Sequence, residues 1–357
     1  MGKMEMMGDR DAITVNNGSE NKNTEAYNVV IDHSTLIWGP DIGGVSFLYG
    51  THDVTVSNSI IGEGLYHSRH PEANGSRGIN GMHSMAMNIS ELDPFRHPRR
   101  ITVHHNLLTT SSDRNPRVMG GENIDIVNNV IYNWQKAPSQ GDPRSVNLIK
   151  NFYIMGPMTN RQDALVIWQP VGGEDGSLRA GTVYESGNIA EGFIRLRGDP
   201  QSVYGDNLFA PYSIRHEDSP QEAYAKIVKS VGANMQVAGK DGRFRRKRDS
   251  VDRRIIRNLE TRSGRFFNGT EKGGIADLDE ITWPDLTGGV PGQDADLDGM
   301  PDAWERKFFG HTKRGSVNDS SSDYDRDGYT DLEEYLNQTN PLGNYYSLYR
   351  KAHLPEY

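Results

Sequence analysis

The sequence predicts an all-β fold, a right-handed parallel β-helix, followed by a mixed region and a small α-helical tail. Three features predict it: β-branched segments that recur about every 23 residues, 39 glycines against only 35% apolar residues, and two aspartate-rich motifs near the C-terminus. Many glycines and few apolar residues are typical of short strands joined by turns rather than of a helical bundle.

The β-branched repeat fills the first half of the chain. Its segments end on a serine or an asparagine, at steps of 25, 47, 23, 22 and 37 residues. We expect the step of 47 to be two turns, with "MHSMAM" (82–87) as the missing copy, and the step of 37 to be one turn with an inserted loop. Strands that cannot bury a face alone must stack, which favours a solenoid. The segments are "VVIDHS" (29–34), "VTVSNS" (54–59), "ITVHHN" (101–106), "IDIVNN" (124–129), "VNLIKN" (146–151) and the weaker "VYESGN" (183–188).

The polar residue that ends each segment predicts a side-chain ladder. In stacked coils each amide lies above its equivalent and bonds to neighbours in both directions, which satisfies buried polar groups. Strand-end turns favour asparagine anyway, so one such residue alone would indicate little. Six in register favour the solenoid; they are Ser34, Ser59, Asn106, Asn129, Asn151 and Asn188.

Two 12-residue segments of the tail match the calcium-loop pattern position by position. They are "DADLDGMPDAWE" (294–305) and "DYDRDGYTDLEE" (323–334), each with glycine at the sixth position and a helix-like stretch at its end. Calcium takes six to eight oxygen ligands, and this spacing wraps them around one point. The seventh residues, Met300 and Tyr329, would offer backbone carbonyls. The acidic candidates are Asp294, Asp296, Asp298, Asp302 and Glu305 in the first loop and Asp323, Asp325, Asp327, Asp331 and Glu334 in the second.

The region between these parts combines helical and basic segments. "PQEAYAKIVKSVGANM" (220–235) has helical spacing after a proline start. "GKDGRFRRKRDSVDRRIIRNLE" (239–260) could hold a polyanion, but such a run is more often a solvated loop that leads into a surface helix. The predicted parts are therefore a β-helix at 1–210, a mixed extension at 211–285 and paired calcium loops at 286–345.

Composition excludes several classes of protein. The net charge of −9 disfavours a nucleic-acid binder, and no run approaches the roughly 18 apolar residues of a membrane helix. The absence of cysteine excludes disulfides and thiolate chemistry. The start "MGKMEMMGDRDAITV" lacks the apolar region of a signal peptide. We expect a monomer that is secreted, periplasmic or on the cell surface, with its leader removed or missing from this chain.

Several motifs resemble the pectate lyase family of parallel β-helix polysaccharide lyases. The resemblance covers most of the chain. It implies cleavage of an acidic polysaccharide, polygalacturonate (pectin), by β-elimination, with calcium bridging enzyme and uronate. The motifs are "NVVIDHSTLIW" (28–38), "ITVHHNLL" (101–108), "DRNPRVM" (113–119), "NNVIYNW" (128–134), "KRDSVDRRII" (247–256) and the two calcium loops of the tail.

The resemblance implies roles for the arginines of the "DRNPRVM" motif. The first arginine of the family's R-x-P-x-x-R pattern, the catalytic base, falls on Arg114, and Pro116 keeps the pattern. The last arginine, a substrate contact, falls on Met119, and we expect Arg117 to take over part of its work. The alternative is that both arginines are surface residues of a loop and serve only the solubility of the protein.

The resemblance also implies a calcium site in the β-helix. The family's first calcium ligands fall on Asp9 and Asp11, and a later one falls on Asp41. The lysine that holds the uronate in many members would fall near Met85 and is absent, which puts ordinary pectate lyase activity in doubt. His83 is polar and close by, so it is the candidate substitute in substrate binding. The sequence also starts too late to hold the family's earliest coils.

The requirements of β-elimination can be matched to these candidate residues one by one. The carboxylate next to C5 must be neutralised, which calcium does as a Lewis acid, and arginine can hold neighbouring uronates by bidentate contacts. Arginine stays protonated to a pH above about 12, so physics alone favours Arg114 as an electrostatic clamp. Histidine is by its nature better suited to act as a base, and the alternatives are His83 and His105, although a residue at the position of His105 is more often a packed ladder residue.

Other functions stay open at this point. A glycosidase needs carboxylates clustered on adjacent coils, and the repeat region has no paired aspartates. A non-catalytic β-helix that binds glycan or serves as structure is favoured by the absent lysine and the short N-terminus. Arg114, Pro116 and "GDRDAI" (8–13) favour an enzyme, on pectate or on another uronate polymer.

Overall fold

The structure is a computed structural model with two compact units. The first contains Met1–Asn234 and Arg248–Pro284, and the second contains Met235–Lys247 and Asp285–Tyr357. The described residues are 11–16, 25–68, 83–90, 95–160, 167–168, 171–172, 178–179, 182–191, 204–209, 212–214, 216–238, 243–246, 248–269, 292–314, 322–327, 329–337 and 339–343.

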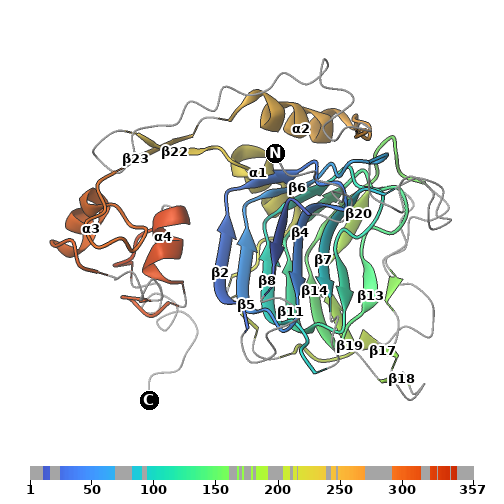
Figure 1. Ribbon diagram of the computed structural model, residues 1–357, viewed down its shortest axis with the longest axis horizontal. Helices are drawn as coiled ribbons and strands as arrows, with labels where there is room; N and C mark the ends of the chain where they lie inside the picture. Colours follow the sequence, from blue (N-terminus) through green and yellow to red (C-terminus); the bar gives the residue numbers. More distant parts are fainter. Residues whose placement is uncertain are drawn as a thin grey trace, which may run out of the picture. The chain divides into compact units, whose positions relative to one another are not determined.

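The first unit is a parallel β-helix built from three sheets, here called A, B and C, which the chain visits in that order in each coil (Figure 1). Sheet A contains β1 (Ile13–Val15), β4 (Ile42–Leu48), β7 (Met85–Ser90), β10 (Arg117–Met119), β13 (Gln140–Asp142) and β16 (Ile167–Trp168). Sheet B contains β2 (Tyr27–Asp32), β5 (His52–Ser57), β8 (Arg99–His104), β11 (Glu122–Val127), β14 (Ser145–Ile149), β19 (Thr182–Ser186) and β21 (Tyr204–Gly205). Sheet C contains β3 (Thr35–Ile37), β6 (Ile60–Gly62), β9 (Leu107–Thr109), β12 (Val130–Tyr132), β15 (Phe152–Ile154) and β20 (Ile189–Glu191). The strands β17 (Val171–Gly172) and β18 (Leu178–Arg179) form a separate antiparallel pair.

The predicted ladder is confirmed at the turn from sheet B to sheet C. Asn129 Oδ1 accepts from Asn106 Nδ2 at 3.1 Å, and Asn151 Oδ1 accepts from Asn129 Nδ2 at 3.1 Å. Asn188 continues the row in the same way, because its Oδ1 accepts from Asn151 Nδ2 at 3.0 Å. The serines extend it through backbone donors: the N–H of Ser34 donates to Ser59 Oγ at 3.0 Å, and the N–H of Ser59 donates to Asn106 Oδ1 at 2.9 Å. The residue before each ladder position has a positive φ, so one turn geometry repeats in every coil.

One expectation about the repeat is wrong. β5 pairs directly with β8, so the step of 47 residues is a single coil and not two. The extra residues lie between β6 and β7, and the "MHSMAM" segment leads into β7 of sheet A instead of forming a copy of the sheet B strands. The step of 37 is one coil with an insertion, as expected, since β14 pairs with β19.

The interior of the coils is apolar and fully buried. Inward side chains of the three sheets form one cluster, which includes Phe47, Ile89, Val118, Ile126 and Trp134. Because strand side chains alternate between faces, the residues next to these point away from the interior. This alternation decides which side chains the sheets present outside.

Two helices cover the outer face of sheet C. They are α1 (Pro220–Ser230) and α2 (Ser250–Thr261), which begin at the N-cap residues Ser219 and Asp249. Apolar side chains of both helices, among them Ile227 and Ile255, share a core with residues of sheet C such as Val130. The sequence did not predict that helices of the 211–285 region would share a core with the β-helix.

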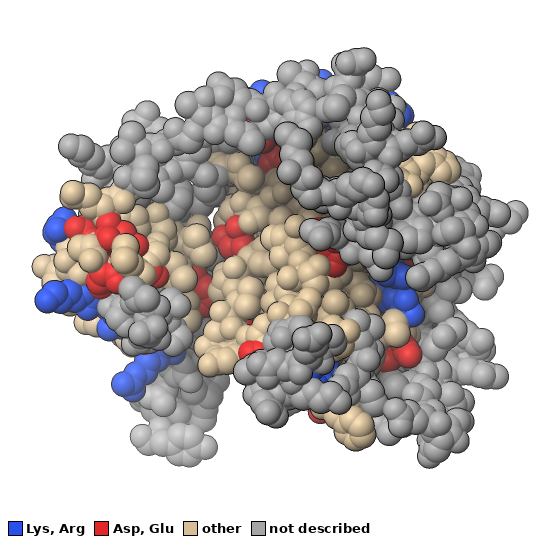
Figure 2. Space-filling model, in the orientation of Figure 1, with Lys and Arg blue, Asp and Glu red and all other residues tan. Residues whose placement is uncertain are grey.

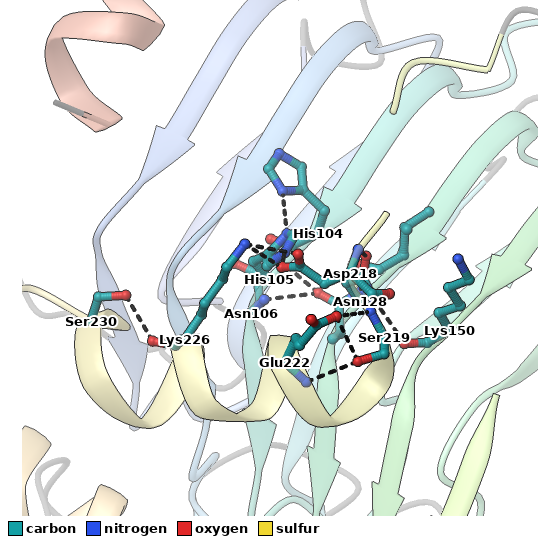
Figure 3. A network of polar contacts seen from close by, with 12 residues as sticks. His104, His105, Asn106, Asn128, Lys150, Asp218, Ser219, Glu222, Lys226 and Ser230 are labelled. Carbon is teal, nitrogen blue, oxygen red and sulfur yellow. Dashed lines mark hydrogen bonds and ion pairs between the residues drawn. The ribbon is translucent and has the colours of Figure 1, made fainter. Parts of the chain in front are cut away.

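Figure 3 shows how the start of α1 docks on the coils. Asp218 lies between His105 and Lys226: its carboxylate is 2.9 Å from His105 Nε2 and 2.6 Å from Lys226 Nζ. Its backbone N–H donates to Asn128 Oδ1 at 3.0 Å. His105 is therefore a packed residue of the turn from sheet B to sheet C, as its position in the repeat suggested.

The second unit contains a hairpin and two short helices. The hairpin joins β22 (Met235–Ala238) and β23 (Arg243–Arg246), and the helices are α3 (Asp302–Phe309) and α4 (Asp331–Asn337). A small core of Met300, Trp304 and Tyr335 packs α3 against α4. None of the helices in the described ranges is long and apolar enough to cross a membrane.

Candidate active site and calcium loops

Residues on the outer face of sheet A form a polar row. Val118 of β10 is buried in the interior, so its neighbours Arg117 and Met119 face outward. The strand register places Arg117 beside Asn88 on β7 and beside Gln140 on β13, and it places Asn88 beside Ser46 on β4. Neighbouring strands lie about 4.8 Å apart, so this row spans about 14 Å along the stack.

Arg114 lies in the turn that leads from sheet C into β10. Its backbone oxygen accepts from the N–H of Met87 at 2.9 Å. Asp113 Oδ1 accepts from the N–H of Arg114 at 2.9 Å and from Gln140 Nε2 at 2.8 Å. The turn is thus tied to the coil before it and to the coil after it, and Arg114 holds a left-handed φ of 57°.

The two arginines are close enough to influence each other. Arg117 is half-buried, and burial lowers the pKa of its guanidinium, with a further contribution from the charge of Arg114. Asp142 and Asp113 act on it in the opposite direction. A role in solubility alone does not require two neighbouring cations, one of them partly buried, because desolvating a charge costs free energy. Such an arrangement is suited to binding a polyanion.

The described aspartates of the predicted calcium site also lie close together. Asp11 accepts from the N–H of Ile42 at 3.1 Å and from Thr14 Oγ1 at 2.8 Å. Burial raises the pKa of Asp11, and the nearby charge of Asp41 raises it further. Asp41 forms an ion pair with His83 Nε2. Asp9 lies outside the described residues.

These two carboxylates give a partial fit to calcium. An ion between them would relieve the repulsion that raises the pKa of Asp11. Calcium takes six to eight oxygens, so further ligands would have to come from substrate, water or residues outside the described part. His83 is only 2% exposed and paired with Asp41, which makes it better placed to orient that carboxylate than to contact a polymer directly.

The candidate residues share one corner of the solenoid. Asp11 precedes β1, Asp41 precedes β4, His83 precedes β7 and Arg114 precedes β10, so each stands at the turn into sheet A of a successive coil. The last two turns are hydrogen-bonded to each other, because Ser112 Oγ donates to His83 O at 2.5 Å. The fold thus stacks residues that are up to 103 positions apart in the sequence.

Four polar neighbours of this column of residues (Asp11, Asp41, His83 and Arg114) were not predicted from the sequence. Asp113 and Gln140 hold the Arg114 turn, and Asp142 and Asn88 flank Arg117. Asp113 stands inside the "DRNPRVM" motif and could have been singled out. Gln140 and Asp142 lie on a three-residue strand, which is too short to show alternation in the sequence.

The two acidic loops of the second unit, the candidate calcium loops, contain unsatisfied carboxylates. Ligand oxygens of Asp294, Asp296 and Asp298 lie within 4.8 Å of one another, as do those of the equivalent residues of the second loop, Asp323, Asp325 and Asp327. Glu305 is 0% exposed and Glu334 is 2% exposed. One oxygen of each finds no hydrogen-bond donor among the described residues, and neither do both oxygens of Asp296. Figure 2 shows acidic side chains gathered on the surface near α3.

The electrostatics of these loops favour a bound cation. Burial raises the pKa of Glu305 to about 7, with a further contribution from the charges of Asp296, Asp298 and Asp302. Burial also raises the pKa of Glu334 to about 8, again assisted by neighbouring aspartates. Buried carboxylates without counter-charges are costly, and an oxygen-seeking cation would neutralise them. These residues therefore fit calcium well.

The two loops repeat each other in detail. The second residue of each loop donates its N–H to the ninth: Ala295 to Asp302 at 2.8 Å, and Tyr324 to Asp331 at 3.0 Å. Leu297 and Arg326, at the fourth position, both have φ 60°. Gly299 has φ 93° at the sixth position, where the pattern requires a sharp turn.

Comparison with known proteins points to one group of enzymes. No protein-family model matches the chain. It is 26% identical to the probable pectate lyase C of Aspergillus terreus over an alignment of 367 positions, which covers 96% of this chain and 70% of that protein. It is also 26% identical to the probable pectate lyase C of Aspergillus fumigatus over an alignment of 338 positions, which covers 89% of this chain and 66% of that protein.

Two solved structures are also similar. A thermostable pectate lyase has 14% identity and a TM-score of 0.41, over 63% of this chain and 54% of that one. A pectate lyase from Bacillus sp. N165 in complex with trigalacturonate has 16% identity and a TM-score of 0.38, over 61% and 65%. Over most of its length the chain is thus similar in sequence to proteins named pectate lyase, and it spans about two thirds of the length of these curated relatives.

Proposed function

We propose that this protein is a polysaccharide lyase that cleaves polygalacturonate by β-elimination with the help of calcium. The observation that carries the proposal is the column at the turns into sheet A. There, Asp11, Asp41, His83 and Arg114 follow one another on four successive coils. The similarity to proteins named pectate lyase over 96% of the chain supports it.

In this proposal, the residues at the turns into sheet A have different roles in the reaction on the bound polymer. In the reaction the proton leaves C5, the bond from C4 to the glycosidic oxygen breaks, and a double bond forms between C4 and C5. The leaving oxygen takes up a proton from water and becomes a hydroxyl group. Calcium, when bound beside Asp11 and Asp41, supplies a Lewis acid for the uronate carboxylate. Arg114 takes the C5 proton in this assignment, which rests on its match to the family pattern, and Arg117 holds a uronate carboxylate through its planar fork.

The test is the formation of unsaturated product from polygalacturonate by the purified chain. We expect its absorbance to grow in calcium and to stop after chelation, with no growth on a neutral glucan. Growth on alginate alone would favour a lyase for another uronate polymer. Binding of polygalacturonate without any unsaturated product would favour the non-catalytic glycan-binding alternative. An enzyme for this polymer acts where the polymer is, so a secreted, periplasmic or cell-surface location belongs to the same proposal.

We further propose that the second unit binds two calcium ions, one in each loop. The observation that favours it is the buried, unsatisfied carboxylate oxygen of Glu305 and of Glu334 at the centre of each acidic cluster. Calorimetric titration of the chelated full chain with calcium checks this. Asp296→Asn and Asp325→Asn should each remove one binding event, and unchanged titrations in both variants would exclude the loops as sites.

A further inference from the structure

Arg314 of the second unit contacts both loops. Its backbone N–H donates to Glu305 Oε1 at 2.8 Å, and Glu305 is the last acidic residue of the first loop. Its Nε donates to Asp331 Oδ2 at 2.7 Å, and Asp331 is the ninth residue of the second loop. One residue therefore joins the end of the first loop to the interior of the second.

The aromatic surroundings hold the Arg314 side chain in place. Its guanidinium lies 5.2 Å from the ring centre of Phe309 at the end of α3, and 4.9 Å from that of Tyr324 at the second position of the second loop. Stacked guanidinium groups lose less freedom when they bond, because their planar fork is already oriented. The contact between the loops is thus a fixed bridge rather than a loose surface ion pair.

Both acidic partners of the bridge are buried and engaged. Glu305 and Asp331 are each 0% exposed. The second oxygen of Asp331 accepts from the N–H of Tyr324, so the position of Asp331 sets the backbone at the start of its loop. The second oxygen of Glu305 is one of the unsatisfied atoms and faces no donor among the described residues. A change at either partner is therefore carried to the other through Arg314.

We propose that the two loops bind calcium cooperatively and that Arg314 transmits the coupling between them. The inference rests on the calcium loops proposed above. An ion in the first loop fixes Glu305, and through its hydrogen bond it fixes the backbone of Arg314. The Arg314 side chain then holds Asp331 and Tyr324 in the arrangement that the second loop needs. Because such coupling is reciprocal, an ion in the second loop assists the first by the same factor.

The experiment is a calorimetric calcium titration of the full chain after chelation. The affinity of the second loop is measured with the first loop intact and with it silenced by Asp296→Asn. The heat that Asp325→Asn removes identifies the second loop. We expect the silencing to weaken the second loop by about 5-fold to 150-fold, which is the usual range of coupling between sites. In the Arg314→Gln background, the same silencing should change the affinity less than about twofold.

A matched control separates the bridge from general charge effects. Arg306→Gln removes an exposed arginine that forms an ion pair with Asp302 of the first loop at 3.0 Å, and this change should keep the coupling. Near-UV circular dichroism in calcium checks that the Arg314→Gln unit is folded. If it is not, Arg314→Lys is measured instead with the same criterion, because it keeps the charge but loses the fork.

The outcomes separate this inference from the calcium loops themselves. Calcium uptake by both loops with no effect of Asp296→Asn on the second loop overturns the cooperativity but keeps the sites. Coupling that survives unchanged in the Arg314 variant shows that another path carries it, and overturns the role of Arg314. No uptake by either loop removes the sites together with the inference. Cleavage of polygalacturonate is not a readout here, so the lyase proposal stands or falls separately.

Discussion

Asn129 shows how a single buried amide supports the stack of coils. It is 0% exposed; its oxygen accepts from Asn106, and its amide nitrogen donates to Val103 O at 2.8 Å and to Asn151 Oδ1. Each of these partners is buried as well, so none can turn to water instead. The ladder therefore contributes to the stability of the fold, because without it these buried polar groups would lack hydrogen-bond partners.

Replacing Asn129 by alanine should destabilise the protein by about 1–3 kcal/mol, because ladder partners on two coils lose their hydrogen bonds in the interior. Urea unfolding, followed by far-UV circular dichroism, measures the change in the free energy of unfolding. Asn207→Ala, at an exposed position, is the control and should change it by less than about 0.5 kcal/mol. An Asn129→Ala variant as stable as the control would argue against a stabilising ladder.

The residues of the candidate site were predictable to different degrees. A sequence motif singled out Arg114 and Arg117, which lie in the turn into sheet A and at the start of β10. The supporting contacts of Asp113 and Gln140 depend on which coil lies next to which. That neighbour relation becomes visible only once the coils are stacked in the correct register.

At the scale of elements, the sheet B strands were predictable and those of sheets A and C were not. Sheet B strands have five or six residues and end two residues before the ladder position, apart from the two-residue β21, whereas each of the six described strands of sheet C has three. Three residues are too few for a periodic signal. The interpretation of the 47-residue step as two coils was also wrong. The insertion between β6 and β7 is about as long as one coil, so in the sequence it looks like an additional coil.

A carboxylate of α2 is buried where this helix packs on the β-helix. Asp252 is 0% exposed and accepts from Thr35 Oγ1 of β3 at 2.8 Å. Burial raises the pKa of Asp252 from 3.8 to about 6, and the bond from Thr35 opposes the shift without cancelling it. The folded protein therefore holds the proton of this group more tightly than the unfolded chain does.

This shift predicts a fall in stability between about pH 4 and pH 6. The folded pKa lies above the unfolded one, so the folded state binds more protons in that window and loses stability as the pH rises through it. A shift of about two units corresponds to about 3 kcal/mol. Asp252→Asn should remove this part of the pH dependence and be more stable than the wild type at pH 7. Urea unfolding at pH 4 and pH 7 measures it, with exposed Asp206→Asn as control. Equal pH dependence in Asp252→Asn and the wild type would contradict the shift.

At the scale of the molecule, the two units have separate hydrophobic cores and different polar features: a side-chain ladder in the first and acidic loops in the second. The β-helix is held by its apolar interior and its ladder, and the second unit by a small core of Met300, Trp304 and Tyr335 between acidic loops. In the sequence, a repeat of about 23 residues marks the first part and a 12-residue loop pattern marks the second. The sequence could not reveal that α1 and α2 belong to the core outside sheet C.

Chelation should therefore loosen the second unit and leave the β-helix folded. At calcium 100 times above the dissociation constant, a bound ion stabilises its fold by about 2.7 kcal/mol. Hydrogen exchange in α3 and α4 should become roughly 100-fold faster after chelation, while β11 and β14 keep their protection. Mass spectrometry of peptides from both units measures this. Unchanged exchange in α3 and α4, or lost protection in β11, would count against separate calcium-dependent folding.

The most direct test of the active-site proposal compares the wild type with two conservative variants on polygalacturonate. Lysine keeps the charge of arginine but loses its planar fork. The rate of unsaturated-product formation in saturating calcium should fall more than about tenfold in Arg114→Lys, a barrier increase above about 1.4 kcal/mol. Arg117→Lys should mainly raise KM, because that residue holds substrate. An Arg114→Lys enzyme that keeps more than about a tenth of the wild-type kcat would contradict a catalytic role for Arg114 at the turn into sheet A.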